Sequence, residues 1–244
     1  ALLIAPAALA QAGVPLRLIV PFATGGPTDI AARVIAPLLS ATLQRPVLVE
    51  NKVGATGAIG TEFVARAAPD GNTVLFGTSS ILAAAPAVSA RLPYDSIRDF
   101  APVGLVATIE NVLVVHPSVP VSTVQELVAY AKANPGKLSY GSSGIGSTYH
   151  LGSELFKSMT GAPIAHVPYK GAGPAAQDLV AGHIQVMFDA FNSAVPNLKA
   201  GNVKALGIAS AQRSPELPAL PTIAEQGVPG YQTTIWIGFF LPAK

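Results

Sequence analysis

The feature that most constrains this fold is the alternation of strand-like and helix-like segments along most of the chain. Apolar runs such as "PLRLIVPF" (15–22) and "NTVLFGT" (72–78) are followed by helical patterns, as over 29–44 and 123–136. Such alternation predicts an α/β fold in which helices cover mostly parallel sheets. The chain has 244 residues and is 50% hydrophobic, which is enough for one large domain or two smaller lobes with separate cores.

Two strand-like stretches are candidates for crossovers between two lobes. One covers 109–115, within the runs "VGLVATI" and "NVLVVHP", which we predict as separate strands, and the other is "GYQTTIWIGFFLP" (230–242). Two α/β lobes joined by two strands place a cleft between the carboxyl ends of their strands, where open sheets bind ligands.

Composition excludes several classes of function. Charged residues make up 11% of the chain and the net charge is +2, which is too sparse and balanced for a nucleic-acid-binding protein. The absence of cysteine excludes disulfides, thiolate catalysis and cysteine-based zinc sites. His150 and Glu154 share a helix face but lack a third ligand at a recognisable spacing, so we expect a hydrogen-bonded pair, no metal and no cofactor.

The first residues predict export. The run "ALLIAPAALAQAG" (1–13) is apolar and ends in small residues, as the tail of a secretory signal does, with cleavage near Ala10–Ala12. The alternative is an apolar first helix or strand. No stretch of about 18 uninterrupted apolar residues follows, so we expect a periplasmic protein that does not span a membrane.

Three glycine-containing loops each precede a predicted helix. They are "PFATGGPTD" (21–29), "YGSSGIGSTYH" (140–150) and "PYKGAGPAA" (168–176). A helix start offers unpaired N–H donors and a partial charge of about +0.5. Two such ends facing each other across a cleft would hold a carboxylate without an arginine. The alternative is ordinary turn chemistry, since α/β proteins need glycine at such turns.

Side chains in these loops refine the prediction. Ser147 or Thr148 suits the N-cap of the second helix, and Pro174 suits the first position of the third. We expect Asp29 to brace its own loop, because a carboxylate there would repel a bound anion. Hydroxyl groups that add donors are those of Thr24, Thr78, Ser79, Ser80, Ser142, Ser143, Ser147 and Thr148.

Lys170, Asp189 and Trp236 lie outside these hydroxyl groups. Several roles are possible for Lys170, and one is expected for each of the other two. Lys170 is the one cation inside a glycine loop, and it would pair with a ligand carboxylate, pair with Asp189 or stay solvated. Asp189 follows an apolar strand, which indicates a place at the mouth of the cleft. Trp236 is most simply a core residue.

A serine hydrolase is the alternative from another functional class. Its nucleophile would be Ser143 or Ser147, with His150 as the base. The segment "GSSGIGS" lacks the G-x-S-x-G turn, and a histidine so close in sequence does not normally reach back to the serine.

Taken together, six segments resemble one family in order. They are "VPFATGGPTDIAAR", "VENKVGATGAIGTEFVARAAPDG", "LPYDSIRDFAPVGLVA", "AKANPGKLSYGSSGIGSTYHL", "HVPYKGAGPAAQDLVAGHIQVMFD" and "RSPELPALPTIAEQGVPGY". The chain from about Val14 to its end resembles the extracytoplasmic solute receptors of the tripartite tricarboxylate transporter family, of the Bordetella uptake gene (Bug) type.

The resemblance implies a type II periplasmic binding-protein fold, with two α/β lobes, a hinge of two crossing strands and closure around a ligand. On it we expect a signal remnant over 1–12, lobe 1 over 13–111 plus 233–244, and lobe 2 over 112–232. Ligands of such receptors are small carboxylates, including dicarboxylates, tricarboxylates, acidic amino acids and aromatic acids. The implied ligand-binding residues are Phe22, Ala23, Thr24, Gly25, Gly26, Thr78, Ser79, Ser142, Ser143, Gly144, Ser147, Thr148 and Asp189.

The resemblance also implies a monomeric receptor that is not an enzyme, needs no cofactor and delivers its ligand to the membrane components of a transporter, or instead to a sensor protein. Two departures from the family pattern stand out. Thr24 occupies a position where the family usually has proline, which adds a hydroxyl group to the first loop. The sequence ends at "FFLPAK", where the family usually continues with a helical segment packed on lobe 1.

Overall fold

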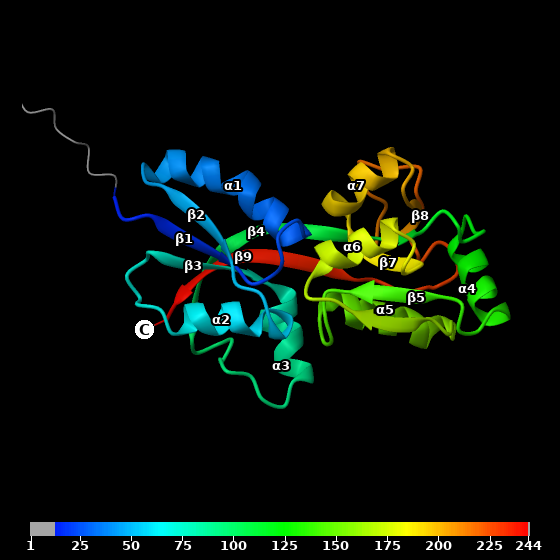
Figure 1. Ribbon diagram of the computed structural model, residues 1–244, viewed down its shortest axis with the longest axis horizontal. Helices are drawn as coiled ribbons and strands as arrows, with labels where there is room; N and C mark the ends of the chain where they lie inside the picture. Colours follow the sequence, from blue (N-terminus) through cyan, green and yellow to red (C-terminus); the bar gives the residue numbers. More distant parts are fainter. Residues whose placement is uncertain (1–12, 244) are drawn as a thin grey trace, which may run out of the picture.

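The computed structural model describes residues 13–243 and forms two lobes side by side (Figure 1). The predicted signal remnant, 1–12, lies outside the described residues. Within the described part, no helix is long and apolar enough to cross a membrane. The elements are β1 (Leu16–Val20), α1 (Pro27–Leu43), β2 (Val47–Asn51), a 3₁₀ turn η1 (Ala55–Gly57), α2 (Ala58–Ala65), β3 (Thr73–Thr78), a π-helical turn η2 (Ser80–Ala84), α3 (Ala85–Val88), β4 (Phe100–Val115), α4 (Val124–Ala133), β5 (Ser139–Ser142), α5 (Thr148–Thr160), β6 (Ala165–Pro168), α6 (Ala172–Val180), β7 (Val186–Ala190), α7 (Phe191–Lys199), β8 (Lys204–Ile208) and β9 (Thr234–Pro242).

Each lobe is built on its own section of sheet. In the first section β1 pairs in parallel with β2 and β3, and β9 runs antiparallel between β3 and β4. In the second, β5 pairs in parallel with β6 and β7, while β4 runs antiparallel to β7 and β8. The α/β prediction is therefore confirmed, with antiparallel pairs confined to the strands that join the lobes.

Strand β4 is common to both sections, which corrects the prediction of two separate strands over this stretch. Its residues 100–110 pair with β9, and 111–115 pair with β7. Glu110, which separates the two predicted runs, pairs with Thr234 of β9, and Asn111 pairs with Ala190 of β7, so the strand passes from one section to the other without a break. The chain returns to lobe 1 just before β9, where the Thr233 N–H donates to the Ala209 carbonyl at 2.7 Å.

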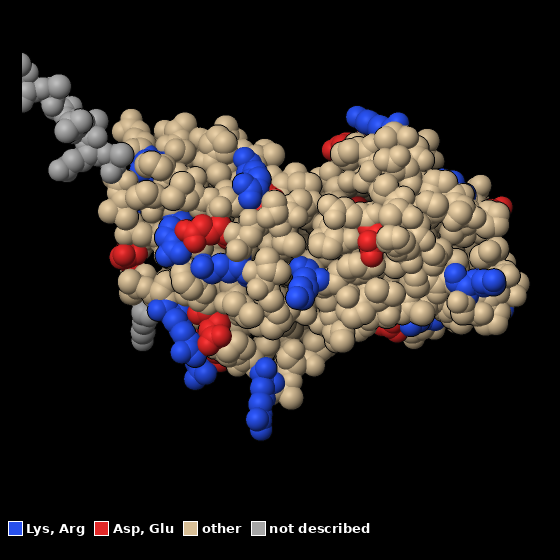
Figure 2. Space-filling model, in the orientation of Figure 1, with Lys and Arg blue, Asp and Glu red and all other residues tan. Residues whose placement is uncertain are grey.

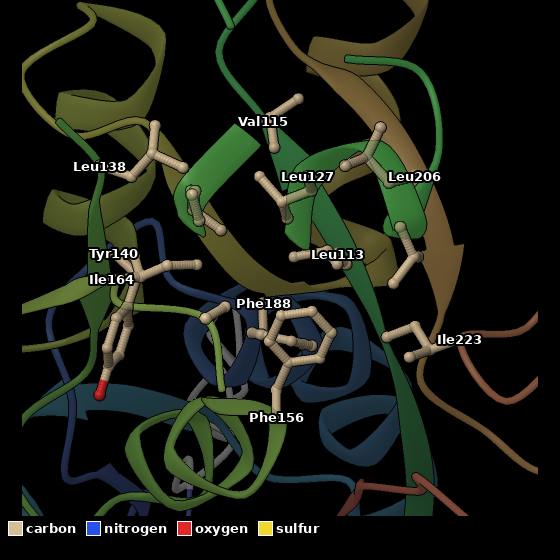
Figure 3. Packing of buried hydrophobic residues seen from close by; sticks show 14 of the residues in the cluster. Leu113, Val115, Leu127, Leu138, Tyr140, Phe156, Ile164, Phe188, Leu206 and Ile223 are labelled. Atoms are coloured by element: carbon tan, nitrogen blue, oxygen red, sulfur yellow. The ribbon is translucent and has the colours of Figure 1, made fainter. Parts of the chain in front are cut away.

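Apolar side chains of the second lobe fill both faces of its sheet. Along β4, Leu113 and Val115 pack with Phe156 and Phe188, whereas Val112 and Val114 face a separate cluster on the other side. This alternation follows from the two-residue period of a strand. Figure 3 shows the first cluster, in which Leu127 of α4 and Phe156 of α5 reach the same layer of side chains. Both faces of this sheet are thus buried by helices.

One part of lobe 1 exposes apolar side chains. Val103 and Leu105 on β4 are 61% and 69% exposed, and Val103 lines a mostly apolar groove of about 260 Å³ together with Leu43 and Phe239. Trp236 is half-buried on β9, so it is only partly a core residue. That a further family segment packs on lobe 1 stays a prediction, as do the expected lobe boundaries.

Parallel strands of both lobes have their carboxyl ends at the junction between the lobes (Figure 1). Helix α1 begins two residues before the predicted start at Asp29, with Pro27 as its first residue. Helix α6 begins at Ala172, so Pro174 is its third residue and not its first as predicted. In both cases the glycine just before the helix is the N-cap, which brings bare backbone close to the junction.

Candidate functional site

Hydrogen bonds join the two lobes at their junction. The hydroxyl oxygens of Ser80 and Thr148 are 2.7 Å apart, and the Thr148 N–H donates to Ser80 Oγ at 3.1 Å. Thr56 Oγ1 donates to the Ile145 carbonyl at 3.2 Å. The Ser80–Thr148 bonds connect the segment just after β3 to the start of α5, and the Thr56–Ile145 bond connects η1 to the second glycine loop. The lobes are therefore in direct contact.

An inner cavity of about 20 Å³ lies between the lobes. A volume of this size is room for about one water molecule. Its lining residues are Phe22, Gly26, Pro27, Thr28, Thr78, Ser80, Ile109, Ser143, Tyr149, Ala172 and Ile235. None of them is charged, and they come from both lobes and from both connecting strands.

Two hydroxyl groups at this cavity have no hydrogen-bond partner among the described residues. Thr78 Oγ1, at the end of β3, and Ser143 Oγ, after β5, are both buried and unpaired. A buried polar group without a partner costs about 1 to 3 kcal/mol. Because the two hydroxyls come from opposite lobes, a polar group between them could accept a hydrogen bond from each.

Helix starts add further donors at the same place. The inner cavity is lined by Gly26 and Thr28 at the start of α1, by Tyr149 in the first turn of α5, and by Ala172 at the start of α6. The N-caps of α1 and α6 are glycines and have no side chain with which to cap the helix. The positive ends of three helix dipoles thus converge on an uncharged cavity, an arrangement that favours an anion.

The lobes approach each other closely between the starts of α1 and α6. A Cβ atom added at Gly173 would lie 3.0 Å from the Gly26 nitrogen, and one at Gly171 would lie 3.2 Å from the Ala23 nitrogen. Both added atoms would meet backbone of the opposite lobe. Glycine at these two positions therefore permits the close contact of the lobes.

Asp29 braces the first loop, as predicted. Its carboxylate accepts hydrogen bonds from the Gly25 N–H at 2.9 Å, from Arg33 at 2.9 Å and from Asn51 at 2.9 Å. Burial alone would raise the pKa of Asp29, but these hydrogen bonds and the Arg33 charge together lower it. Asn51 also donates to the Phe22 carbonyl at 3.0 Å, so it ties both ends of the loop to β2. Sequence reasoning missed Asn51, which appears only as the last residue of a strand.

The geometry does not assemble a hydrolytic triad. Ser147 Oγ accepts from the His150 backbone N–H, as expected of an N-cap, and the imidazole of His150 accepts from the Gly146 N–H at 3.1 Å. A different serine, Ser142, lies 2.6 Å from Nε2 of His166, but it is fully buried. Neither contact couples an exposed serine to a base.

The histidine pair lies behind the second loop. The rings of His150 and His166 stack at a centroid distance of 4.3 Å. Burial, followed by the neighbouring His150, lowers the pKa of His166 to about 4. Glu154 accepts from the Tyr140 hydroxyl at 2.6 Å and pairs with Lys157, which corrects the expected hydrogen-bonded pair with His150. These residues hold the loop from behind.

Asp189 lies in the interior, which corrects its expected place at the mouth of the cleft. The residue is 2% exposed, and its Oδ1 accepts from the Ala190 N–H at 2.8 Å. Burial raises the pKa of Asp189 to about 7, despite hydrogen bonds that lower it. Burial, and secondarily the Asp189 charge, raises the pKa of Tyr149 well above its ordinary value. Tyr149 lines the inner cavity, whereas Asp189 is buried and does not line it.

The predicted site residues fall into three groups. Phe22, Gly26, Thr78 and Ser143 line the inner cavity, and Gly144 joins Phe22 and Ser143 in a second, outer cavity. Thr148 joins the lobes, and Ser142 and Ser147 hold the second loop. The others line neither cavity: Ala23, Thr24 and Gly25 of the first loop, Ser79, which is buried without a partner, and Asp189. Sequence reasoning missed Thr28 and Tyr149, which look like ordinary residues of a first helical turn.

Neither a charged patch on the face drawn in Figure 2 nor a metal site among the described residues is present. Lysine, arginine and acidic side chains are scattered over the face drawn in Figure 2, without an extended patch of one sign. Among residues 13–243, no group of three or more potential ligand residues is placed to hold a metal ion. A larger depression of about 630 Å³ on lobe 1, beside Tyr94 and Arg98, is lined by one lobe alone. The junction remains the place where both lobes contribute polar groups.

Comparison with known sequences gives a consistent result. The model of the tripartite tricarboxylate transporter family receptors matches residues 31–244. A UPF0065 protein from the tcbD-tcbE intergenic region of Pseudomonas sp. strain P51 is 41% identical over 229 residues, which are 93% of this chain and 68% of that protein. BugT of Bordetella pertussis is 39% identical over 229 residues, which are 93% of this chain and 70% of BugT.

Solved structures agree with the sequence comparison. An R. palustris protein solved with adipate superposes with a TM-score of 0.91 at 42% identity, covering 93% of this chain and 76% of that one. The periplasmic binding protein BugD gives 0.90 at 37% identity, with 93% and 76% covered. MatC from Rhodopseudomonas palustris with bound malate gives 0.89 at 37% identity, with 95% and 79% covered. The periplasmic binding-protein fold is thereby confirmed.

The buried carboxyl of Asp189 predicts a distinctive dependence of stability on pH. Its pKa rises from 3.8 in the unfolded chain to about 7 in the folded protein, so the folded state holds the proton more tightly. This contribution to stability is fully present below about pH 4 and is lost as the pH rises through 7. Asp189→Asn carries no charge, so we expect its Tm to exceed that of the wild type at pH 8 and the difference to shrink toward pH 4.

Thermal unfolding of both proteins between pH 4 and 8 measures this difference. Glu216→Gln, which neutralises an exposed carboxylate, is the control and should leave the curve close to that of the wild type. A difference between Asp189→Asn and wild type that stays constant with pH would contradict the assignment.

Proposed function

This chain belongs to the tripartite tricarboxylate transporter receptor family, and we propose that it captures a small organic carboxylate between its two lobes. As a member of that family it is a solute-binding receptor and not an enzyme.

One observation carries the assignment of the site. Thr78 and Ser143, from opposite lobes, place unpaired buried hydroxyls at a cavity where the starts of α1, α5 and α6 meet. A carboxylate oxygen would accept hydrogen bonds from these hydroxyls and interact favourably with the helix ends. No charged residue lines this cavity, so an arginine is not needed.

Relatives support the ligand class. The R. palustris structure contains adipate and MatC contains malate, and both ligands are small organic acids. We infer that this chain also takes a small acid of the di- or tricarboxylate, acidic amino-acid or aromatic-acid type. A site formed from backbone N–H groups and hydroxyls recognises the carboxylate group itself. Its affinity depends little on the remaining atoms of the ligand.

Ligand entry requires the lobes to part. At the present separation the inner cavity has room for about one water molecule, which is too little for an organic acid. β4 and the segment before β9 are the connections across the junction, so bending there would open the cleft. Closure around the ligand would then couple binding to the position of the lobes.

We place this receptor in the periplasm, as a monomer that passes its ligand to the membrane components of a tripartite tricarboxylate transporter. Support for the location comes from BugD, a periplasmic binding protein, and support for delivery comes from the family description. The closed form, in which residues of both lobes are fixed together, is the form that a membrane partner would recognise.

Removal of the unpaired hydroxyls tests the site. We expect Thr78→Val and Ser143→Ala each to weaken binding by roughly tenfold or more, since a hydrogen bond to a charged group contributes about 1.5 to 3 kcal/mol. Neither variant should lower the Tm of the protein without ligand, because the lost hydroxyl has no partner there. Thermal unfolding against a panel of mono-, di- and tricarboxylates, amino acids and aromatic acids identifies the ligand, and calorimetry then compares the variants.

Ser158→Ala, which removes an exposed hydroxyl from α5, is the matched control and should bind like the wild type. A wild-type protein whose Tm no acid raises, and which carries no acid by native mass spectrometry, would refute carboxylate capture. Unchanged binding by both variants would refute this placement of the site.

A second variant tests closure. Gly173→Ala adds a methyl group 3.0 Å from the Gly26 nitrogen across the junction, so we expect it to hinder closure. Overpacking of this kind costs about 1 to 3 kcal/mol, and affinity for the acid should fall by at least about fivefold. Without ligand the lobes can part, so the Tm should change little.

Gly104→Ala is the control, because its added methyl group would meet nothing within 4 Å. Calorimetry with the acid found in the panel measures both variants. Equal affinity of Gly173→Ala and wild type would show that this contact is not part of the bound state.

A further inference from the structure

A second, outer cavity adjoins the inner one. It has a volume of about 280 Å³ and is lined by 53–57 at the start of α2, by 143–145 of the second loop and by 168–170 after β6. Phe22 and Ser143 line both cavities, so these two residues lie between the two spaces, and parting of the lobes would join them. A ligand held by one end in the inner cavity would extend into the outer one.

Lys170 brings a positive charge to the outer cavity. It is the one charged residue among all those that line the two cavities. It is exposed, and within the described part of the chain no carboxylate lies within 4 Å of its amine. Pairing with Asp189, one of the roles open from the sequence, does not occur in this structure, where Asp189 is buried and Lys170 is exposed.

The loop that carries Lys170 is held in place. The neighbouring Tyr169 hydroxyl donates to Asp178 at 2.6 Å, and its N–H donates to the Ser142 carbonyl at 3.0 Å. Gly171 packs against the backbone of Ala23 in lobe 1. The backbone beneath Lys170 is thus fixed relative to both loops, while its long side chain stays free to adjust.

We propose that the outer cavity takes the second acidic group of a dicarboxylate whose first carboxylate is held in the inner cavity, and that Lys170 is the residue that selects for it. The inference rests on the proposed function and adds a specificity-determining residue to it. The inner cavity holds the first carboxylate of any such ligand. The Lys170 amine then favours ligands that place a second negative charge in the outer cavity.

Chemistry at the mouth explains why a monocarboxylate would bind less well. Its alkyl end would lie beside the Lys170 ammonium group. The two form no ion pair or hydrogen bond, so the ammonium group stays hydrated. A second carboxylate instead forms an ion pair in a partly enclosed space, where charges are screened less than on an open surface. A flexible lysine also accommodates acids of more than one length, because its amine is a point charge on a four-carbon stem.

Matched pairs of acids test the proposal. Calorimetry compares glutarate with pentanoate and adipate with hexanoate on wild type and on Lys170→Met, which keeps the length of the side chain and removes its charge. We expect the diacid of a pair to bind wild type more tightly than the monoacid. In Lys170→Met the diacid should lose about fivefold or more, the size of a favourable partly exposed ion pair, and the monoacid should stay within about twofold.

Lys199→Met removes an exposed lysine of the same lobe that lines neither cavity, and it controls for the change in net charge. Lys170→Arg should retain most of the diacid preference, because it retains the charge. An equal loss for both acids of a pair, or no loss for either, would overturn the role of Lys170 and leave carboxylate capture standing. Failure of every acid to bind wild type would overturn the proposed function, and this inference with it.

Discussion

Strand β4 is hydrogen-bonded in both sheet sections, and this pairing sets how the two lobes face each other. Residues 100–110 of β4 pair with β9 in lobe 1, and 111–115 pair with β7 in lobe 2. This continuous strand orients the two lobes so that the carboxyl ends of their parallel strands meet at one junction. The glycine loops and helix starts are at the junction because they follow those strand ends. Bending of the same strand is the motion that would open the cleft without disrupting either core.

At the junction, polar groups are buried before any ligand is present. Within 13–243 the hydroxyls of Thr78 and Ser143 lack partners, and the glycines before α1 and α6 provide no side chain to cap those helices. Each unpaired hydroxyl costs about 1 to 3 kcal/mol, and a bound carboxylate would remove that cost. The groups at the junction would therefore interact with an anion through dipoles alone. Charge enters only at the outer cavity, with Lys170.

Local chemistry was readable from the sequence, whereas long-range contacts were not. Ser147 as an N-cap and Asp29 as a brace follow from their positions beside a helix start, and both predictions are confirmed. The continuity of β4 was missed because the charged residue Glu110 separates two apolar runs, and only its pairing with Thr234 of β9 shows that the strand continues through it. The burial of Asp189 was also missed, since its position at a strand end in the sequence does not reveal which residues cover it.

The contact of Ser80 with Thr148 joins residues far apart in the chain, so no local pattern could have predicted it. Which predicted residues contact a ligand stays a prediction.

A crystal structure of the protein with the acid that most raises its Tm tests the central claim most directly. We expect closed lobes with one carboxylate of the acid between them, its oxygens within about 3 Å of Thr78 Oγ1 and Ser143 Oγ and facing the starts of α1 and α6. An acid bound elsewhere, or one held between the lobes by charged side chains while these two hydroxyls remain unpaired, would contradict it.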